Sequence, residues 1–249
     1  MDIRDKRVVV TGGASGLGLA IVHTVLAKGG LVAVLDKDDA GLDRLRTEQP
    51  RVECFSCDVS MYSQVVGAMS AFHSKCGPAH VVINNAGMLH SSLLVRITSA
   101  GAERHDPAEW ERVLATNLSS VFYVSACAVE KMIVTRTKGI IVNISSISAA
   151  GNAGQSAYSA SKAGVDALTA TWSKELGLSG IRVVGIAPGF VDTESTRKAL
   201  SETALQEIVR KTPLKRLGNP DEIARAVIGV VENDFINGTI VQVHGGIVL

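Results

Sequence analysis

Short apolar runs and helical patterns alternate along the whole chain. The apolar runs have the character of parallel strands that are covered on both faces. They occupy residues 8–10, 31–35, 52–55, 80–83, 139–144, 181–186 and 239–243. The intervening helical patterns cover residues 19–26, 62–75, 107–132, 158–180 and a stretch from 220 onwards. This alternation predicts an α/β fold with one doubly wound parallel sheet, about seven strands and helices on both faces.

Neither a linker nor an internal repeat divides the chain, so we expect a single domain over residues 1–249. Two stretches interrupt its regularity. Residues 88–106 have no clean periodicity and predict a surface excursion on the ligand-facing side. Residues 190–213 form a mixed helical stretch with charges on several faces, which predicts a lid or substrate loop.

The first predicted strand runs into a glycine-rich turn, Thr11-Gly-Gly-Ala-Ser-Gly-Leu-Gly18, and then into a helix. A strand, a glycine turn and a helix in this order are typical of a dinucleotide site. The glycines let the backbone approach a pyrophosphate, and the helix N-terminus offers unpaired N–H groups. The spacing Gly12-x-x-x-Gly16-x-Gly18 differs from the commonest form of this motif.

Acidic residues follow the second and third strands. Asp36 lies where a carboxylate accepts hydrogen bonds from the adenosine ribose, and it would repel the extra phosphate of NADP. This favours NAD, although Lys37 is adjacent. Asp58 is open to two interpretations, as a contact of the adenine amino group or as the cap of the next helix.

Tyr158 and Lys162 predict acid–base chemistry. Residues four apart on a helix share a face, and an ammonium beside a phenol lowers the phenol pKa. A tyrosine tuned in this way exchanges a proton with a substrate oxygen, which suits the interconversion of an alcohol and a ketone. A serine from the preceding strand end could hold the same oxygen. Asn117 lies inside a predicted helix, where it is either solvated, holds a water or kinks the helix.

Composition argues against several other classes. Lys plus Arg number 25 against 24 Asp plus Glu, giving a net charge of +1, and aromatic residues make up 4%. Neither nucleic acid nor a membrane surface is therefore an expected partner. We see neither a leader nor an apolar run of membrane-spanning length, and the four cysteines suggest no disulfide framework, so we expect a reducing, cytoplasmic location. The six histidines do not cluster in the sequence, and we expect no metal site.

Taken together, these motifs resemble the classical short-chain dehydrogenase/reductase family over essentially the whole chain. The glycine turn, Asp58, Asn84-Asn-Ala-Gly87, Asn117, the serines before Tyr158-x-x-x-Lys162, and Pro188-Gly189 fall in the family's order. The resemblance implies an NAD(P)-dependent Rossmann-type oxidoreductase. It assigns Tyr158 as general acid/base, Lys162 as the group that lowers its pKa and binds the nicotinamide ribose, and Asn117 as the holder of a water.

The resemblance also assigns the binding residues. The expected cofactor contacts are Gly12, Ser15, Gly16, Leu17, Gly18, Asp36, Asp58, Val59, Asn85, Ala86, Gly87, Tyr158, Lys162, Pro188, Gly189, Val191 and Thr193. The expected substrate contacts are Ser146, Gln155 and Tyr158. Sequence spacing points to Ser145 as the catalytic serine, whereas the strand register points to Ser146, which we favour. Residues 88–107 also form a longer segment than is usual in the family.

Within the family, the chain is similar to bacterial 3-oxoacyl reductases through Gly151-Asn-Ala-Gly-Gln155 and Pro213-Leu-Lys-Arg-Leu-Gly218. Those enzymes usually take NADPH, against which Asp36 argues. We therefore expect an NAD-dependent 3-hydroxyacyl or other secondary-alcohol dehydrogenase, whose carbonyl or alcohol substrate could be an acyl thioester. An NADPH-dependent 3-oxoacyl-[acyl-carrier-protein] reductase is the alternative, and a non-catalytic NAD sensor is a more distant one. The resemblance implies a homotetramer, or else a homodimer.

Overall fold

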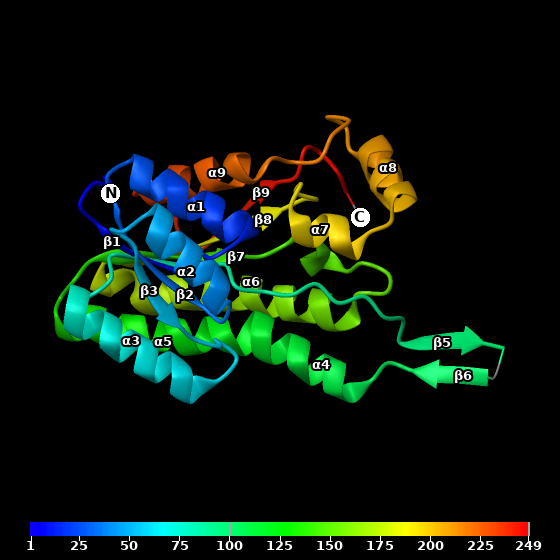
Figure 1. The fold of residues 1–249 in the computed structure, drawn as a ribbon, viewed down its shortest axis with the longest axis horizontal. Helices are drawn as coiled ribbons and strands as arrows, with labels where there is room; N and C mark the ends of the chain where they lie inside the picture. The colour runs from blue at the N-terminus through cyan, green and yellow to red at the C-terminus, as the bar shows by residue number, and fades with distance from the viewer. Residues whose placement is uncertain (100, 249) are drawn as a thin grey trace.

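The computed structural model describes residues 1–99 and 101–248 and confirms the doubly wound parallel sheet (Figure 1). The seven strands lie in the order β3-β2-β1-β4-β7-β8-β9, and all are parallel. Their bounds are β1 Arg7–Thr11, β2 Leu31–Asp36, β3 Glu53–Ser56, β4 Val81–Asn84, β7 Gly139–Ile144, β8 Ile181–Pro188 and β9 Ile240–Val243. The chain winds outward from β1 to β3 and then returns to β4 on the other side of β1. Ligands of such sheets bind at this reversal, beyond the carboxyl ends of the strands.

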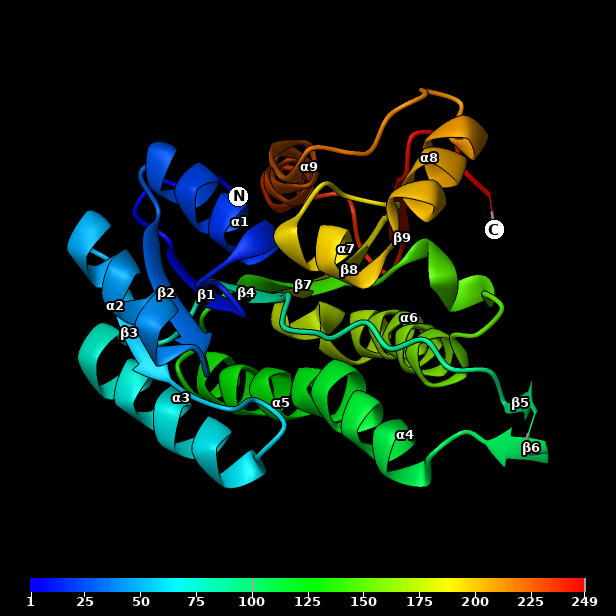
Figure 2. The same cartoon turned by 45° about the vertical axis from the view of Figure 1, so that its right-hand side comes forward.

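Two helical layers cover the sheet because alternate strand residues point to opposite faces. Val8 and Val10 pack in one apolar cluster and Val9 in the other. The first cluster is covered by α1 (Gly16–Ala27), α2 (Asp39–Glu48) and α9 (Pro220–Glu232). The second is covered by α3 (Tyr62–Cys76), α5 (Ser120–Val134) and α6 (Ser156–Leu176), as Figure 2 shows. Short 3₁₀ turns flank α6 at Ile147–Ala150 and Gly177–Ser179.

The helix predicted from residue 107 is continuous but contains a wider turn. It consists of α4 (Pro107–Leu114), a π-helical turn (Ala115–Ser119) and α5. Pro107–Val134 is the one helix of the described residues that is long and apolar enough to cross a membrane, and 39% of its most apolar window is buried. A core helix passes the same test, and α5 packs against α3 and the sheet.

Sequence patterns missed three elements. Residues 88–106 contain a hairpin of β5 (Val95–Thr98) and β6 (Gly101–Arg104), which projects from the body in both ribbon views. Its side chains are largely exposed, so they carry no buried stripe for a pattern to reveal. Helix α2 was also missed. The stretch 190–213 is helical as predicted, with α7 (Glu194–Ala199) and α8 (Glu202–Lys211).

Candidate active site

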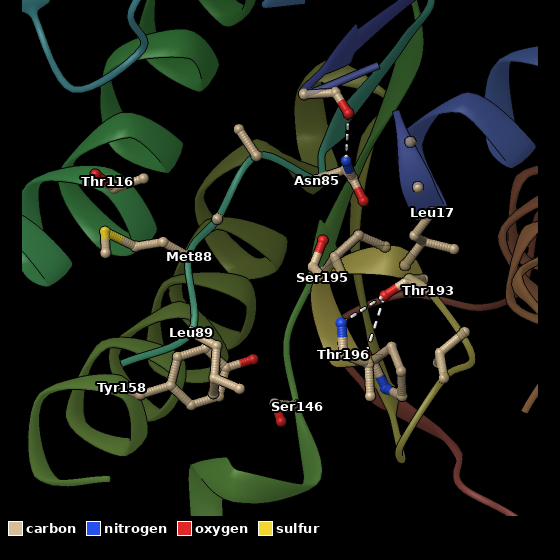
Figure 3. Close-up of a pocket in the computed structure, with 18 of the residues that line it drawn as sticks. Leu17, Asn85, Met88, Leu89, Thr116, Ser146, Tyr158, Thr193, Ser195 and Thr196 are labelled. Atoms are coloured by element: carbon tan, nitrogen blue, oxygen red, sulfur yellow. Dashed lines mark hydrogen bonds between the residues drawn. The ribbon is translucent and has the colours of Figure 1, made fainter. Parts of the chain in front are cut away.

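A cleft of about 460 Å³ opens at the carboxyl ends of the strands and gathers the predicted residues (Figure 3). Every residue expected to contact the cofactor lines this cleft, as do Ser146 and Gln155. Asn117 is the exception among the predicted site residues, since it lies behind the cleft wall.

The glycine turn has the shape that a pyrophosphate requires. Gly12 and Gly16 have φ values of +64° and +52°, which favour glycine. A Cβ on Gly18 would lie 2.0 Å from the Gly12 carbonyl oxygen, so the turn packs directly on its helix. Ser15 at the helix N-cap accepts no side-chain capping bond, which leaves N–H groups facing the cleft. The turn therefore fits a dinucleotide.

Asp36 is held in a fixed orientation at the end of β2. Its two carboxylate oxygens accept hydrogen bonds from the backbone N–H groups of Ala14 (2.9 Å) and Asp38 (3.0 Å). A carboxylate has about four acceptor positions, so acceptor capacity remains for ribose hydroxyls. Lys37 also lines the cleft.

Asp58 lines the cleft but does not cap α3, because Met61 is the N-cap of that helix and no side chain makes a capping bond there. Its Oδ1 accepts hydrogen bonds from the N–H (3.0 Å) and hydroxyl (2.7 Å) of Ser60, which fixes the turn before α3. Burial acts to raise the pKa of this carboxyl, but the Ser60 hydrogen bonds and Lys37 together hold it below its ordinary value.

Tyr158 and Lys162 lie on one face of α6, beside the end of β7. The Lys162 side chain is buried, its Nζ donates to the Ile144 carbonyl (2.7 Å), and it lies 5.8 Å from the centre of the Tyr158 ring. Burial lowers the pKa of Lys162 to about 8, opposed by the charge of Asp166.

The expected lowering of the Tyr158 pKa is wrong for the protein without its cofactor. Burial raises the pKa of Tyr158, and hydrogen bonding from Ser146 offsets part of this rise. The reason is geometric, since Lys162 directs its ammonium at the Ile144 carbonyl, and burial of both side chains disfavours their charged forms.

The two candidate serines face different partners at the end of β7. Hydrogen bonding from Ser146 lowers the pKa of Tyr158. Ser146 also caps the following 3₁₀ turn, because its Oγ accepts a hydrogen bond from the Ser148 N–H (3.1 Å). Ser145 continues the sheet by donating its N–H to the Ile186 carbonyl (2.7 Å). Its buried hydroxyl lowers the pKa of Asp166. The geometry favours Ser146 as the serine beside the reacting oxygen.

Asn117 is fully buried in the π-helical turn. Its Oδ1 accepts from the Met88 N–H (2.8 Å), and its Nδ2 donates to the Met88 carbonyl (2.9 Å) and the Ser161 hydroxyl (3.3 Å). The wider turn thus lets a helix side chain fix the backbone that follows Asn84-Asn-Ala-Gly87. Its role with a water stays a prediction.

Beyond Ser146, Gln155 and Tyr158, sequence reasoning assigned no individual substrate contact. The cleft is also lined by the apolar side chains of Met88, Leu89, Ile147, Phe190 and Leu200. The Ser92 N–H donates to the Gly154 carbonyl (2.7 Å), which holds the segment after Met88 across the loop that precedes Gln155. These residues come from loops, whose side-chain positions no periodicity predicts. Within the described residues, no group of three or more His, Cys, Asp or Glu is placed to hold a metal ion.

Comparison with known proteins identifies the family. Residues 6–204 match the short chain dehydrogenase family. A 3-oxoacyl-[acyl-carrier-protein] reductase FabG of Thermotoga maritima is 35% identical, over 100% of both chains. An acetoacetyl-CoA reductase of Synechocystis sp. is 35% identical over 98% of this chain and 97% of its own. A (3R)-3-hydroxyacyl-CoA dehydrogenase of Canis lupus familiaris is 33% identical over 98% and 97%.

The chain therefore belongs to the short-chain dehydrogenase family, and the resemblance drawn from its sequence is confirmed. It is an NAD(P)-dependent oxidoreductase of the kind that acts on CH–OH and keto groups.

Proposed function

We propose that this protein interconverts 3-hydroxyacyl and 3-oxoacyl compounds with NAD(H), and that Tyr158 is the general acid/base. The observation that carries the proposal is that Ser146, Tyr158 and Lys162 line the same cleft as the glycine turn and a set of apolar side chains. The three similar proteins described above are named for acyl substrates, which supports the same class here.

The residues of the cleft divide the cofactor between them. The glycine turn would hold the pyrophosphate, Asp36 the adenosine ribose, and Asp58 with Val59 the adenine. Lys162 would hold the nicotinamide ribose, while residues 188–193 would flank the nicotinamide. A bound nicotinamide supplies or accepts the hydride.

The protein's own residues manage the proton. In reduction, the Tyr158 hydroxyl donates its proton to the substrate oxygen, and the Ser146 hydroxyl donates a hydrogen bond to the same oxygen. The Lys162 ammonium stabilises the phenolate that remains. In oxidation, the phenolate takes the proton back from the alcohol. Burial makes these electrostatic effects stronger than they would be in water.

We propose NAD rather than NADP because the fixed Asp36 carboxylate would meet the extra phosphate of NADP. Lys37 supports the alternative, an NADPH-dependent 3-oxoacyl-[acyl-carrier-protein] reductase, because it follows Asp36 directly and also lines the cleft. The two hypotheses predict different ratios of kcat/KM for NADH to kcat/KM for NADPH. We expect the Asp36→Ala variant to lose NADH preference by about tenfold or more, in line with the loss of a charge-assisted hydrogen bond. A wild type that prefers NADPH would refute the NAD assignment.

We also propose a cytoplasmic homotetramer. The four cysteines are free, which fits a reducing compartment. Large apolar side chains remain exposed on α4 and α5, which fits burial against other subunits.

The first test measures oxidation of NADH with acetoacetyl-CoA, a steroid ketone and a small sugar ketone. We expect turnover with the thioester. The Tyr158→Phe variant should lose at least about a thousandfold in kcat, in the range of a general acid–base effect, while its affinity for NADH stays within about twofold. Retained turnover in this variant would exclude Tyr158 as the acid/base.

A further inference from the structure

A half-buried carboxyl, that of Asp166, and a buried hydroxyl, that of Ser145, lie behind Lys162 and have no part in the proposed chemistry. Asp166 is on α6, one turn beyond Lys162, and Ser145 is at the end of β7. Asp166 Oδ1 and Ser145 Oγ are both shielded from solvent, and neither makes a hydrogen bond of regular geometry. Buried polar atoms are normally satisfied, so the buried Oδ1 of this half-buried carboxyl needs an explanation.

Position along the helix supplies one. Tyr158, Lys162 and Asp166 follow each other at intervals of four residues and therefore lie on one face of α6. Lys162 thus has the phenol of Tyr158 one turn before it and the carboxyl of Asp166 one turn after it on the same helix face. Burial raises the pKa of Asp166, whereas the Ser145 hydroxyl and the Lys162 charge lower it.

The other surroundings of Lys162 offer little charge. From β7 it meets the Ile144 carbonyl, and from the end of β4 it faces the Gly87 backbone, where an added Cβ would be 3.7 Å from Nζ. The titratable neighbours that face it on α6 are Tyr158 and Asp166. Asp166 is the charged group found to act on the pKa of Lys162.

We propose that Asp166, beside the Ser145 hydroxyl, is a positioning residue that keeps Lys162 protonated beside Tyr158. The inference rests on the proposed role of Tyr158 as acid/base. It adds no bond-breaking step, since the proton still passes between the Tyr158 oxygen and the substrate oxygen. A buried ammonium without a carboxylate loses its proton at lower pH, and Tyr158 then loses the charge that stabilises its phenolate.

Removing the carboxylate lowers the pH at which Lys162 becomes neutral, so the alkaline limb of alcohol oxidation moves to lower pH. A less stabilised phenolate moves the acid limb to higher pH. The active range of the variant therefore narrows from both sides.

The test compares Asp166→Asn with the wild type in alcohol oxidation. We expect kcat near neutral pH to fall by about tenfold, because one unit of pKa corresponds to a tenfold change in population. The KM for the alcohol should change by less than about threefold, and both limbs should move inward. Asp166→Glu should restore part of the range, and Ser145→Ala should give a smaller shift in the same direction.

Glu175→Gln is the matched control, since it removes the same charge from an exposed position of the same helix. Its pH profile should match that of the wild type. A profile of Asp166→Asn with unmoved limbs, or a uniform fall in kcat at all pH values, would overturn the proposal, because a structural defect alone would not move the limbs.

A second measurement is independent of turnover. In protein labelled with ¹³C at lysine Cε, the Lys162 resonance is assigned by its absence from Lys162→Met. We expect its titration midpoint to fall by about one pH unit in Asp166→Asn. An unchanged midpoint overturns the proposal even if the natural substrate is not an acyl compound, whereas a shifted midpoint in an enzyme that tolerates Tyr158→Phe would contradict the proposed function alone.

Discussion

A buried lysine ammonium is unfavourable for the folded protein, because its charge has lost its hydration. Lys162 has 4% of its surface exposed and a pKa of about 8, against an ordinary 10.5. The unfolded chain therefore binds the proton more tightly than the folded protein does. Below about pH 8 this destabilises the fold in full, and the effect fades as pH rises towards 10.5.

The Lys162→Met variant tests this balance. We expect it to lose turnover but to be more stable than the wild type at pH 7 by about 1–3 kcal/mol, because burial lowers the pKa of Lys162 and each unit of pKa corresponds to about 1.4 kcal/mol. The difference should shrink as pH rises above 8, because the wild type then sheds its buried charge. Thermal unfolding of both cofactor-free proteins at several pH values measures it. A variant less stable than the wild type at pH 7 would show that the Ile144 and Asp166 contacts outweigh desolvation.

Replacement of glycine by alanine should have opposite effects at Gly18 and Gly67. A methyl group on Gly18 would meet the Gly12 carbonyl oxygen at 2.0 Å, so Gly18→Ala must deform the turn and should weaken NADH binding by at least about tenfold. Gly67 lies in α3 with nothing within 4 Å of its added Cβ. We therefore expect Gly67→Ala to stabilise the protein by about 0.5–1 kcal/mol without affecting NADH. Thermal unfolding and NADH titration of the two variants test these expectations. Equal effects of the two substitutions on NADH affinity would refute the role of the glycine turn in binding the dinucleotide.

Among the elements, we expect the β5–β6 hairpin to contribute least to the stability of the fold. An isolated two-stranded hairpin is marginally stable, and its strand residues are mostly exposed. The pairing continues one step into the body, where the His105 N–H donates to the Leu94 carbonyl (2.9 Å).

Because of this hydrogen bond, the hairpin can be shortened without moving Leu94 and His105 apart. Replacing residues 95–104 by Asn-Gly would join Leu94 and His105 through a two-residue hairpin turn. We expect the melting temperature to change by less than about 4 °C, which corresponds to under 1 kcal/mol, and kcat/KM for acetoacetyl-CoA to stay within about threefold. A matched insertion of Asn-Gly without the deletion controls for the new turn. A large loss of kcat/KM with longer acyl thioesters would instead place the hairpin in substrate binding.

Elements buried on both faces could be predicted from the sequence, whereas elements that rely on exposed positions could not. Gly139–Ile144 is apolar enough to be recognised as a strand, and its register placed Ser146 in the cleft. The pKa of Tyr158 depended on where Lys162 directs its ammonium, which no spacing contains. Asn117 was singled out by its unfavourable place in a helix, but its partner, Met88, lies in a loop. Asp166 gave no signal at all, because an acidic residue on a helix usually faces water.

At the scale of the whole molecule, the long helix Pro107–Val134 carries large apolar side chains that remain exposed in the single chain. Phe122 is 51% and Val134 is 74% exposed, and Trp110 is also exposed. Monomers rarely expose large contiguous apolar patches, so we expect other copies of the chain to cover this helix in a tetramer.

Phe122→Glu places a charge in that surface. Burying an unpaired carboxylate is strongly unfavourable, so we expect the variant to dissociate to smaller species in light scattering at concentrations where the wild type is tetrameric. Leu31→Glu is the control, because Leu31 is also apolar and is similarly exposed, at 53%, but lies at the amino end of β2. A wild type that is monomeric, or a Phe122→Glu variant that stays tetrameric, would show that this helix is not the interface. If both variants dissociate, the effect reflects added charge in general rather than a contact at Phe122.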